Sequence, residues 1–237
     1  MGKLLAIAGR ELRAYFASPL AYVIAALFML VSGYLFSLIL FATRQADMRP
    51  LFQNLAVVFL LITPALTMRL IADERSRSTF EMLMTRPITD VQIVVGKYLG
   101  ALGYLVFLMA LTLVFPVTFL LVKANPDWYP MLSGYLGTFF LGASFMAIGV
   151  LASSLTANVA VAAIATFAIS LVIWLLPSAS SIVGQQASGV LEYLSVISHQ
   201  DSLSRGIIDT SDLLFYVTFI GTCLYMTVRS INVSRWR

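Results

Sequence analysis

Six long runs of apolar residues divide the chain, and polar stretches separate them. The runs cover residues 20–43, 55–71, 98–122, 131–151, 159–176 and 213–228. A membrane core about 30 Å thick requires roughly 20 apolar residues when they form a helix. We therefore predict an all-α integral membrane protein with six transmembrane helices, folded as one domain over residues 1–237.

Prolines mark the places where these helices are expected to begin, bend or end. Ser18 and Pro19 form a start signal for the first span, with serine as N-cap and proline at the first helical position. Pro64 predicts a kink in the second span and Pro116 a bend near the far end of the third. Pro177 is expected to close the fifth span.

Residues 3–16 precede the first span and have an amphipathic pattern. Leu4, Ala8 and Leu12 recur at helical spacing, and Arg10 and Arg13 share another face. A basic amphipathic helix of this kind can lie in the membrane interface. The alternative is an ordinary polar lead-in to the first span.

The polar stretch 73–90, between the second and third spans, holds a short predicted helix. Ser78 and Glu81 form a capping box, which places a helix at 79–85, and Pro87 ends it. Thr89 and Gln92 form a second box that opens the next helix. The short helix exposes an apolar side and an acidic side, although on chemistry alone a solvated loop with a chance cap remains open. Its apolar side consists of Phe80, Leu83 and Met84.

The last polar stretch, residues 178–212, is the longest connection. Val190, Leu191, Leu194 and Ile197 are helically spaced, so we expect part of it to lie on the membrane surface. Ser211 and Asp212 are expected to cap the sixth span.

Composition and charge support a membrane protein with a defined orientation. The chain is 60% hydrophobic and 11% charged, whereas soluble domains carry about 25% charged residues. With six spans, eleven Lys and Arg fall on the side of the termini and of the 73–90 stretch, and four fall on the other side. Because basic residues accumulate in the cytoplasm, both termini are predicted to be cytoplasmic. The net charge of +4 therefore reflects the orientation of the chain in the membrane, and it does not indicate a nucleic-acid partner.

The chemistry of an enzyme is missing from the sequence. Neither Gly-Lys pair has the spacing of a phosphate-binding loop. His199 is the single histidine, so a metal site is disfavoured and a surface or interfacial histidine is expected. Cys223 is the single cysteine, so it cannot form an internal disulfide. No charged residue lies deep in a predicted span, which argues against proton-coupled transport.

Several motifs resemble those of ABC-2-type export permeases, and the resemblance is closest to the branch that includes the gliding-motility permease subunit. They are Ser-Pro-Leu-Ala-Tyr at 18–22, Asp-Glu-Arg at 73–75, Thr-x-Glu-x-Leu at 79–83, Pro87, and Gly-Lys at 96–97. Ser78 departs from the pattern, since many members have glycine there. The resemblance implies that residues 3–16 form an elbow helix and that 73–90 forms a coupling loop. It implies that the coupling residues are Glu74, Thr79, Phe80, Glu81, Leu83, Met84 and Pro87.

The function implied by this resemblance is export driven by a separate ATP-binding subunit. ATP and magnesium would bind to that partner, and this chain would bind no cofactor. A second permease copy or a paralogous permease would complete a dimer in the inner membrane of a bacterium or archaeon. Because the spans lack charge, a lipid-like cargo is favoured. Two alternatives remain: a mechanotransmission subunit that drives a periplasmic or accessory envelope protein, and a channel or carrier that works without an ATPase.

Overall fold

The computed structural model describes residues 2–43, 45–76, 89–121, 127–180, 189 and 193–234, and these residues form helices and turns. Six helical segments within them are long and apolar enough to cross a membrane, which confirms the predicted number of spans. The helices, in chain order, are α1 (Gly2–Ala17), α2 (Pro19–Thr43), α3 (Arg49–Thr67), α4 (Ala72–Ser76), α6 (Asp90–Leu111), α7 (Val114–Leu121), α8 (Trp128–Leu155), α9 (Val159–Ser180), α11 (Val196–Ser204) and α12 (Thr210–Ser234).

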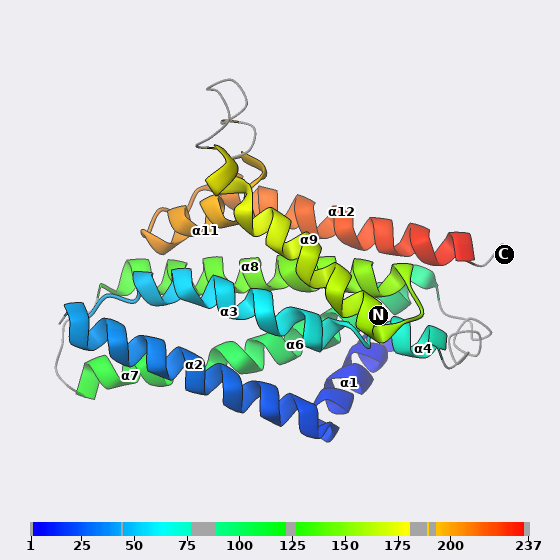
Figure 1. Ribbon diagram of the computed structural model, residues 1–237, viewed down its shortest axis with the longest axis horizontal. Helices are drawn as coiled ribbons and strands as arrows, with labels where there is room; N and C mark the ends of the chain where they lie inside the picture. Colours follow the sequence, from blue (N-terminus) through cyan, green and yellow to red (C-terminus); the bar gives the residue numbers. More distant parts are fainter. Residues whose placement is uncertain are drawn as a thin grey trace.

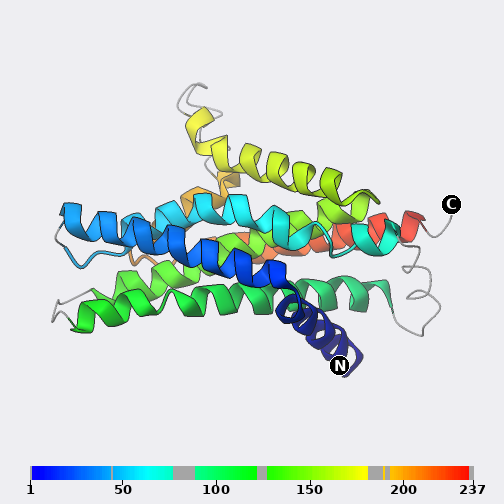
Figure 2. The same ribbon diagram turned by 60° about the horizontal axis from the view of Figure 1, so that its bottom comes forward.

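Helices α3 and α8 form the centre of the bundle, and α2 and α9 lie at its margins (Figures 1 and 2). The candidate span Arg49–Ser76 begins with α3, and 72% of the residues in its most apolar stretch are buried. In α8 the share is 78%. The corresponding shares are 28% for α2 and 17% for α9. The marginal helices therefore present apolar faces to whatever surrounds the bundle.

Glycines on α8 allow its neighbours to approach closely. A Cβ atom added at Gly149 would lie 2.0 Å from the Thr67 hydroxyl oxygen, and one at Gly134 would lie 2.2 Å from the Phe52 ring. Van der Waals contact needs a larger separation, so a side chain at either position would force its neighbour to move. The central α3–α8 contact therefore depends on these glycines.

The effect of each proline on its helix depends on where in the helix it lies. The third span breaks at Thr112, where α6 gives way to a turn before α7, four residues ahead of Pro116. A proline ring clashes with the carbonyl four residues earlier, so the predicted irregularity is confirmed. Pro64 lies within α3, which continues to Thr67. The prediction that Pro177 ends the fifth span was wrong: α9 continues to Ser180. There the proline removes only one hydrogen bond, in the final turn.

Local side chains stabilise the starts of two helices that begin before the predicted spans. Helix α3 begins at Arg49, ahead of the predicted span at 55, and the Asp47 carboxylate accepts a hydrogen bond from the Arg49 amide at 2.9 Å. The sixth span begins at Thr210, where Asp209 accepts from the Ser211 amide at 3.0 Å, so the prediction that Ser211 and Asp212 cap it was wrong. This hydrogen bond lowers the pKa of Asp209.

The 178–212 connection is packed onto the bundle where α11 forms. Val196 and Leu203 of α11 are fully buried, and the helix packs against α8. A location on the membrane surface stays a prediction. Leu194 is exposed, whereas Val190 and Leu191 lie outside the described residues.

His199 on α11 is buried rather than at a surface or interface, which corrects the sequence prediction. Its Nδ1 lies 2.6 Å from the Asp212 carboxylate, and its Nε2 lies 3.0 Å from the Tyr193 carbonyl oxygen. Its ring also stacks on Phe215 at 4.1 Å between centroids. These contacts attach α11 to the first turns of α12.

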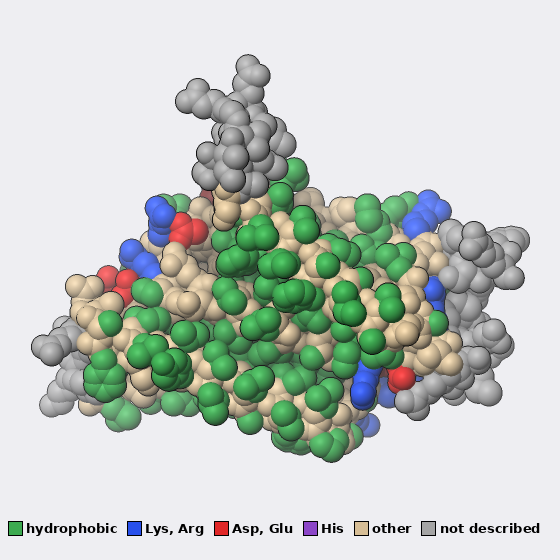
Figure 3. Space-filling view, in the orientation of Figure 1, with side chains coloured by type: hydrophobic (Ala, Val, Ile, Leu, Met, Phe, Trp, Pro, Cys, Tyr) green, Lys and Arg blue, Asp and Glu red, His purple; other side chains and the backbone are tan. Residues whose placement is uncertain are grey.

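The two ends of the bundle differ in what they contain. Helices α1 and α4 and the C-terminal end of α12 lie at one end, and α11 lies toward the other (Figures 1 and 2). We call these the α1–α4 end and the α11 end. On the face shown in Figure 3, charged side chains gather toward both ends and an apolar surface covers the middle. This is the distribution that a membrane-spanning bundle requires.

The glycine contacts predict a specific loss of stability. Gly149→Ala forces α3 and α8 apart at Thr67, and such overpacking costs about 1–3 kcal/mol. The matched control is Gly33→Ala on α2, because nothing lies within 4 Å of a Cβ atom there. Thermal unfolding in detergent, followed by size-exclusion chromatography, should show a lower Tm for Gly149→Ala only. Equal Tm values for the two variants would refute the close α3–α8 contact.

Candidate functional site

The predicted coupling residues fall on a segment of which only the two flanks are described. Glu74 lies on α4, which ends at Ser76. Thr79, Phe80, Glu81, Leu83, Met84 and Pro87 lie outside the described residues. On the far flank, Thr89 and Gln92 form the predicted capping box, with hydrogen bonds of 3.4 and 3.3 Å, and α6 begins at Asp90. Helices α4 and α6 are therefore the two stems of the 77–88 segment.

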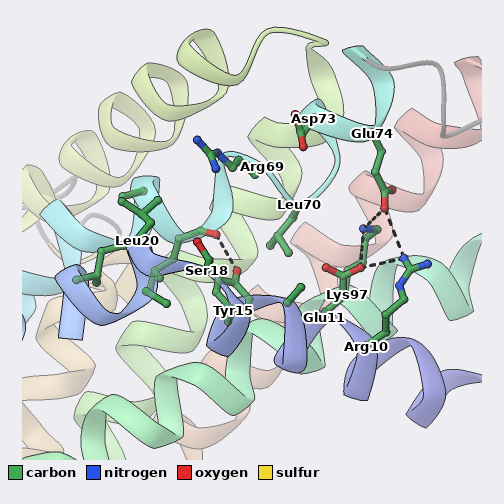
Figure 4. A pocket seen from close by; sticks show the side chains of 15 residues that line it. Arg10, Glu11, Tyr15, Ser18, Leu20, Arg69, Leu70, Asp73, Glu74 and Lys97 are labelled. Carbon is green, nitrogen blue, oxygen red and sulfur yellow. Dashed lines mark hydrogen bonds and ion pairs between the residues drawn. The ribbon is translucent and has the colours of Figure 1, made fainter.

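A buried cluster of charges joins these stems to α1. The Lys97 ammonium on α6 is 1% exposed and lies 2.8 Å from Glu74 on α4 and 3.1 Å from Glu11 on α1 (Figure 4). Arg10 lies at the margin, 3.1 Å from Glu11 and 3.6 Å from Glu74. The four side chains carry two positive and two negative charges, so the cluster is balanced. We call it the Lys97 cluster.

Glycines bring α1 close enough for the Lys97 cluster to form. A Cβ atom at Gly96 would lie 2.8 Å from the Ile7 side chain, and one at Gly100 would lie 2.6 Å from the Glu11 Cβ. Since larger residues would push α1 away, these glycines set the distance between α1 and α6. The Gly96-Lys97 pair therefore has a physical explanation: glycine allows the approach of α1, and lysine binds its carboxylate.

Tyr15 attaches the second half of α1 to the bundle. Its hydroxyl donates a 2.7 Å hydrogen bond to the Leu66 carbonyl, and its ring stacks on Tyr104 at 5.1 Å between centroids. Tyr104 in turn donates to the Ala21 carbonyl at 2.5 Å. Burial, with a smaller contribution from Glu11, raises the pKa of Tyr15 well above its usual range, so the hydroxyl keeps its proton and continues to donate.

Ser153 on α8 attaches the α4 stem to the centre of the bundle. Its hydroxyl oxygen accepts hydrogen bonds from the amides of Ile71 and Ala72 at 3.1 and 3.0 Å, and its hydroxyl donates to the Met68 carbonyl at 3.2 Å. These are the backbone groups of the turn between α3 and α4. Both stems of the 77–88 segment therefore connect to the rest of the molecule through specific polar contacts.

A cavity of about 570 Å³ adjoins the Lys97 cluster. One part of its wall is charged and another part, from α2 and α3, is apolar (Figure 4). Its lining residues are Arg10, Glu11, Ala14, Tyr15, Ser18, Leu20, Ala21, Ile24, Ala65, Leu66, Arg69, Leu70, Asp73, Glu74 and Lys97. Among the described residues, no group of three or more His, Cys, Asp or Glu side chains could hold a metal ion.

The arrangement is that of a membrane bundle whose polar connection between the second and third spans is attached to several helices. A family model described as "ABC-2 family transporter protein" matches residues 20–235. The chain belongs to this family. As an ABC-2 family protein it is the membrane component of a transporter, and membership implies a partner subunit that binds ATP. Membrane domains of this family are typically non-catalytic permeases. A comparison with curated proteins found no match.

Sequence reasoning identified Glu74 but missed its partners in the Lys97 cluster. It did not predict that the Lys97 side chain is buried within the bundle. The available signal was Gly96 next to a lone lysine in an apolar run. No local pattern connects Lys97 with Glu11, which is 86 residues away in the chain.

Removing the Lys97 charge should destabilise the permease more than removing an exposed charge. Lys97→Met leaves Glu11 and Glu74 with only the exposed Arg10 as a cation, and removing the buried partner of an ion pair costs about 3–5 kcal/mol. Arg205→Gln is the control, because the Arg205–Asp201 pair at the α11 end is largely exposed, and such pairs contribute about 0–1 kcal/mol.

The measurement is the Tm of each variant in detergent. Combining Lys97→Met with Glu11→Gln and Glu74→Gln should recover part of the loss, because the carboxylates are then neutral. If Lys97→Met unfolds at the same temperature as Arg205→Gln, the cluster contributes nothing to stability.

Proposed function

We propose that this ABC-2 permease couples ATP hydrolysis in a separate subunit to export through the 77–88 segment. In this proposal α1 is the elbow helix and 77–88 carries the coupling helix. The coupling residues are Glu74, which joins the α4 stem to the Lys97 cluster, and six residues that contact the ATP-binding subunit, which holds ATP and magnesium. The six are Thr79, Phe80, Glu81, Leu83, Met84 and Pro87. The observation that supports coupling most strongly is the Lys97 cluster, because it joins both stems of this segment to α1.

We further propose that the α1–α4 end is cytoplasmic, in the inner membrane of a bacterium or archaeon. The excess of Lys and Arg on this side, eleven against four, supports that orientation. Two bundles are needed for a path between them, so a second copy or a paralogous permease completes a dimer. The weakly buried α2 and α9 offer apolar surface for that contact.

A lipid-like cargo fits the apolar character of the spans. A hydrophilic solute that loses its water shell within the membrane needs polar or charged groups to replace it. Charged groups of the described residues include the Lys97 cluster near one end of the spans and the His199–Asp212 pair toward the other. An apolar or lipid-linked cargo needs no such groups in the middle.

Mechanotransmission remains the second candidate, supported by the long connection between α9 and α12 and by the resemblance to the gliding-motility branch. A channel or carrier without an ATPase is the third. Two assays on the reconstituted complex distinguish export from mechanotransmission: ATPase stimulation by lipids, and capture of an envelope protein. The capture assay replaces residues 181–192 with a Gly-Ser linker of equal length, because α11 beyond them is buried in the bundle.

Site-specific crosslinking tests the coupling proposal. A photo-crosslinking residue at Phe80 should join the permease to its ATP-binding subunit in membranes, whereas one at Tyr129, 87% exposed on α8 near the other end, should not. Because the ATP-binding subunit is cytoplasmic, the same experiment reports the orientation. A crosslink at Tyr129 without one at Phe80 would refute both the coupling role and the orientation.

Variants in the same segment separate binding from coupling. Leu83→Ala should weaken association with the ATP-binding subunit through lost apolar contact. Glu81→Ala removes part of a helix cap, which costs about 1 kcal/mol, too little to unfold the bundle. It should therefore assemble normally and lose the ATPase stimulation that assembly produces. Wild-type assembly and ATPase activity in both variants would show that 77–88 is only a connection.

A further inference from the structure

We propose that the cavity at the α1–α4 end binds the phosphate head group of an anionic membrane lipid, and that Arg69 is its principal ligand. Arg69 is not among the coupling residues, although Glu74 of that set also lines the cavity. The proposal holds whichever cargo the permease moves, and it rests on the charges and the shape of the cavity.

Within the part of the chain that the structure describes, Arg69 differs from the other charged residues of the cavity wall. Arg10, Glu11, Glu74 and Lys97 pair with one another in the Lys97 cluster. Asp73, which also lines the cavity, is not without an interaction partner. Arg69 is exposed, and it makes no hydrogen bond or ion pair with any described residue (Figure 4). The cavity therefore offers a guanidinium that pairs with none of the described residues, and a guanidinium matches the geometry of a phosphate group.

The apolar part of the cavity wall favours a lipid over a free phosphate ion. Leu20 and Ile24 on α2 and Ala65 on α3 line this part, and all three belong to predicted membrane spans. Beyond the cavity, exposed apolar residues continue along α2, including Val23 and Leu27. A ligand with a charged head and a hydrocarbon chain would meet both kinds of surface at once.

The position and size of the cavity agree with this ligand. It lies where α1 ends and α2 begins, which is where a chain passes from the interface into the membrane. The first turn of α2 borders it, and a helix N-terminus adds a partial positive charge to that of Arg69. A volume of about 570 Å³ falls within the range of small-molecule sites, about 300–1,000 Å³.

The test measures lipid binding to the full chain in nanodiscs of phosphatidylcholine that contain a small fraction of phosphatidylglycerol. Native mass spectrometry counts the phosphatidylglycerol retained after release from the nanodisc. Arg69→Gln should lower its apparent affinity about tenfold, as expected for the loss of one charge-assisted contact. Arg69→Lys should restore part of the binding. Arg13→Gln is the matched control, because Arg13 is an exposed arginine on α1 that does not line the cavity.

Ile24→Trp gives a second, independent variant, because it fills the apolar part of the cavity and leaves Arg69 in place. It should also reduce phosphatidylglycerol retention. Equal retention by wild type, Arg69→Gln and Ile24→Trp would overturn the proposal, as would equal loss in Arg13→Gln and Arg69→Gln.

Two further arms identify the ligand. Phosphatidylcholine should not replace phosphatidylglycerol at equal concentration, and equal binding of the two would contradict an anionic site. Glycerol phosphate, which has the head group without acyl chains, should not displace the lipid at millimolar concentration, and displacement would mean that the site takes a free phosphate compound. The Phe80 crosslink to the ATP-binding subunit should persist in Arg69→Gln, so failure of this proposal is distinguishable from failure of the coupling proposal.

Discussion

The burial of the Lys97 ammonium between two carboxylates is the constraint on which the α1–α4 end depends. A buried charge without partners is costly, so Glu11 and Glu74 must remain beside Lys97 while the bundle is folded. The two carboxylates lie on α1 and α4, and the lysine lies on α6. Ile7 is the buried residue of α1, and Leu12, Tyr15 and Phe16 pack against the core while partly exposed. Apolar contacts, the Lys97 cluster and the close approach at Gly96 and Gly100 therefore attach this helix together.

The proposed coupling would use this attachment. If the ATP-binding subunit displaced 77–88, as we propose, the displacement would act on α6 directly and on α1 through the Lys97 cluster. It would act on α8 through Ser153, whose hydroxyl contacts the turn before α4. Since α8 and the span of α3 are the most buried, a force at this turn would act on the centre of the bundle.

The sequence predicted those features that depend on local patterns. Six spans follow from the length and composition of each run, the Thr89–Gln92 box from four adjacent residues, and the break before α7 from Pro116. It did not predict the pairing of Lys97 with Glu11 or of His199 with Asp212, because these pairs form through tertiary packing. For the same reason Asp212 was interpreted as a helix cap. An aspartate near a helix start can cap it, but in the structure the Asp212 carboxylate pairs with His199 instead. The roles of Phe80, Glu81 and Leu83 stay predictions.

Distance measurements between spin labels on α1 and α4 test most directly whether these helices move as one unit. The labels are placed at Arg13 and Ser76, both exposed, in a permease whose Cys223 is replaced by alanine. In the complex with its ATP-binding subunits, the distance distribution should be the same without nucleotide and with bound ATP. In Lys97→Met, the distribution should broaden and shift when ATP binds. A shift in the wild-type complex, or an unchanged narrow distribution in Lys97→Met, would contradict the central role of the Lys97 cluster.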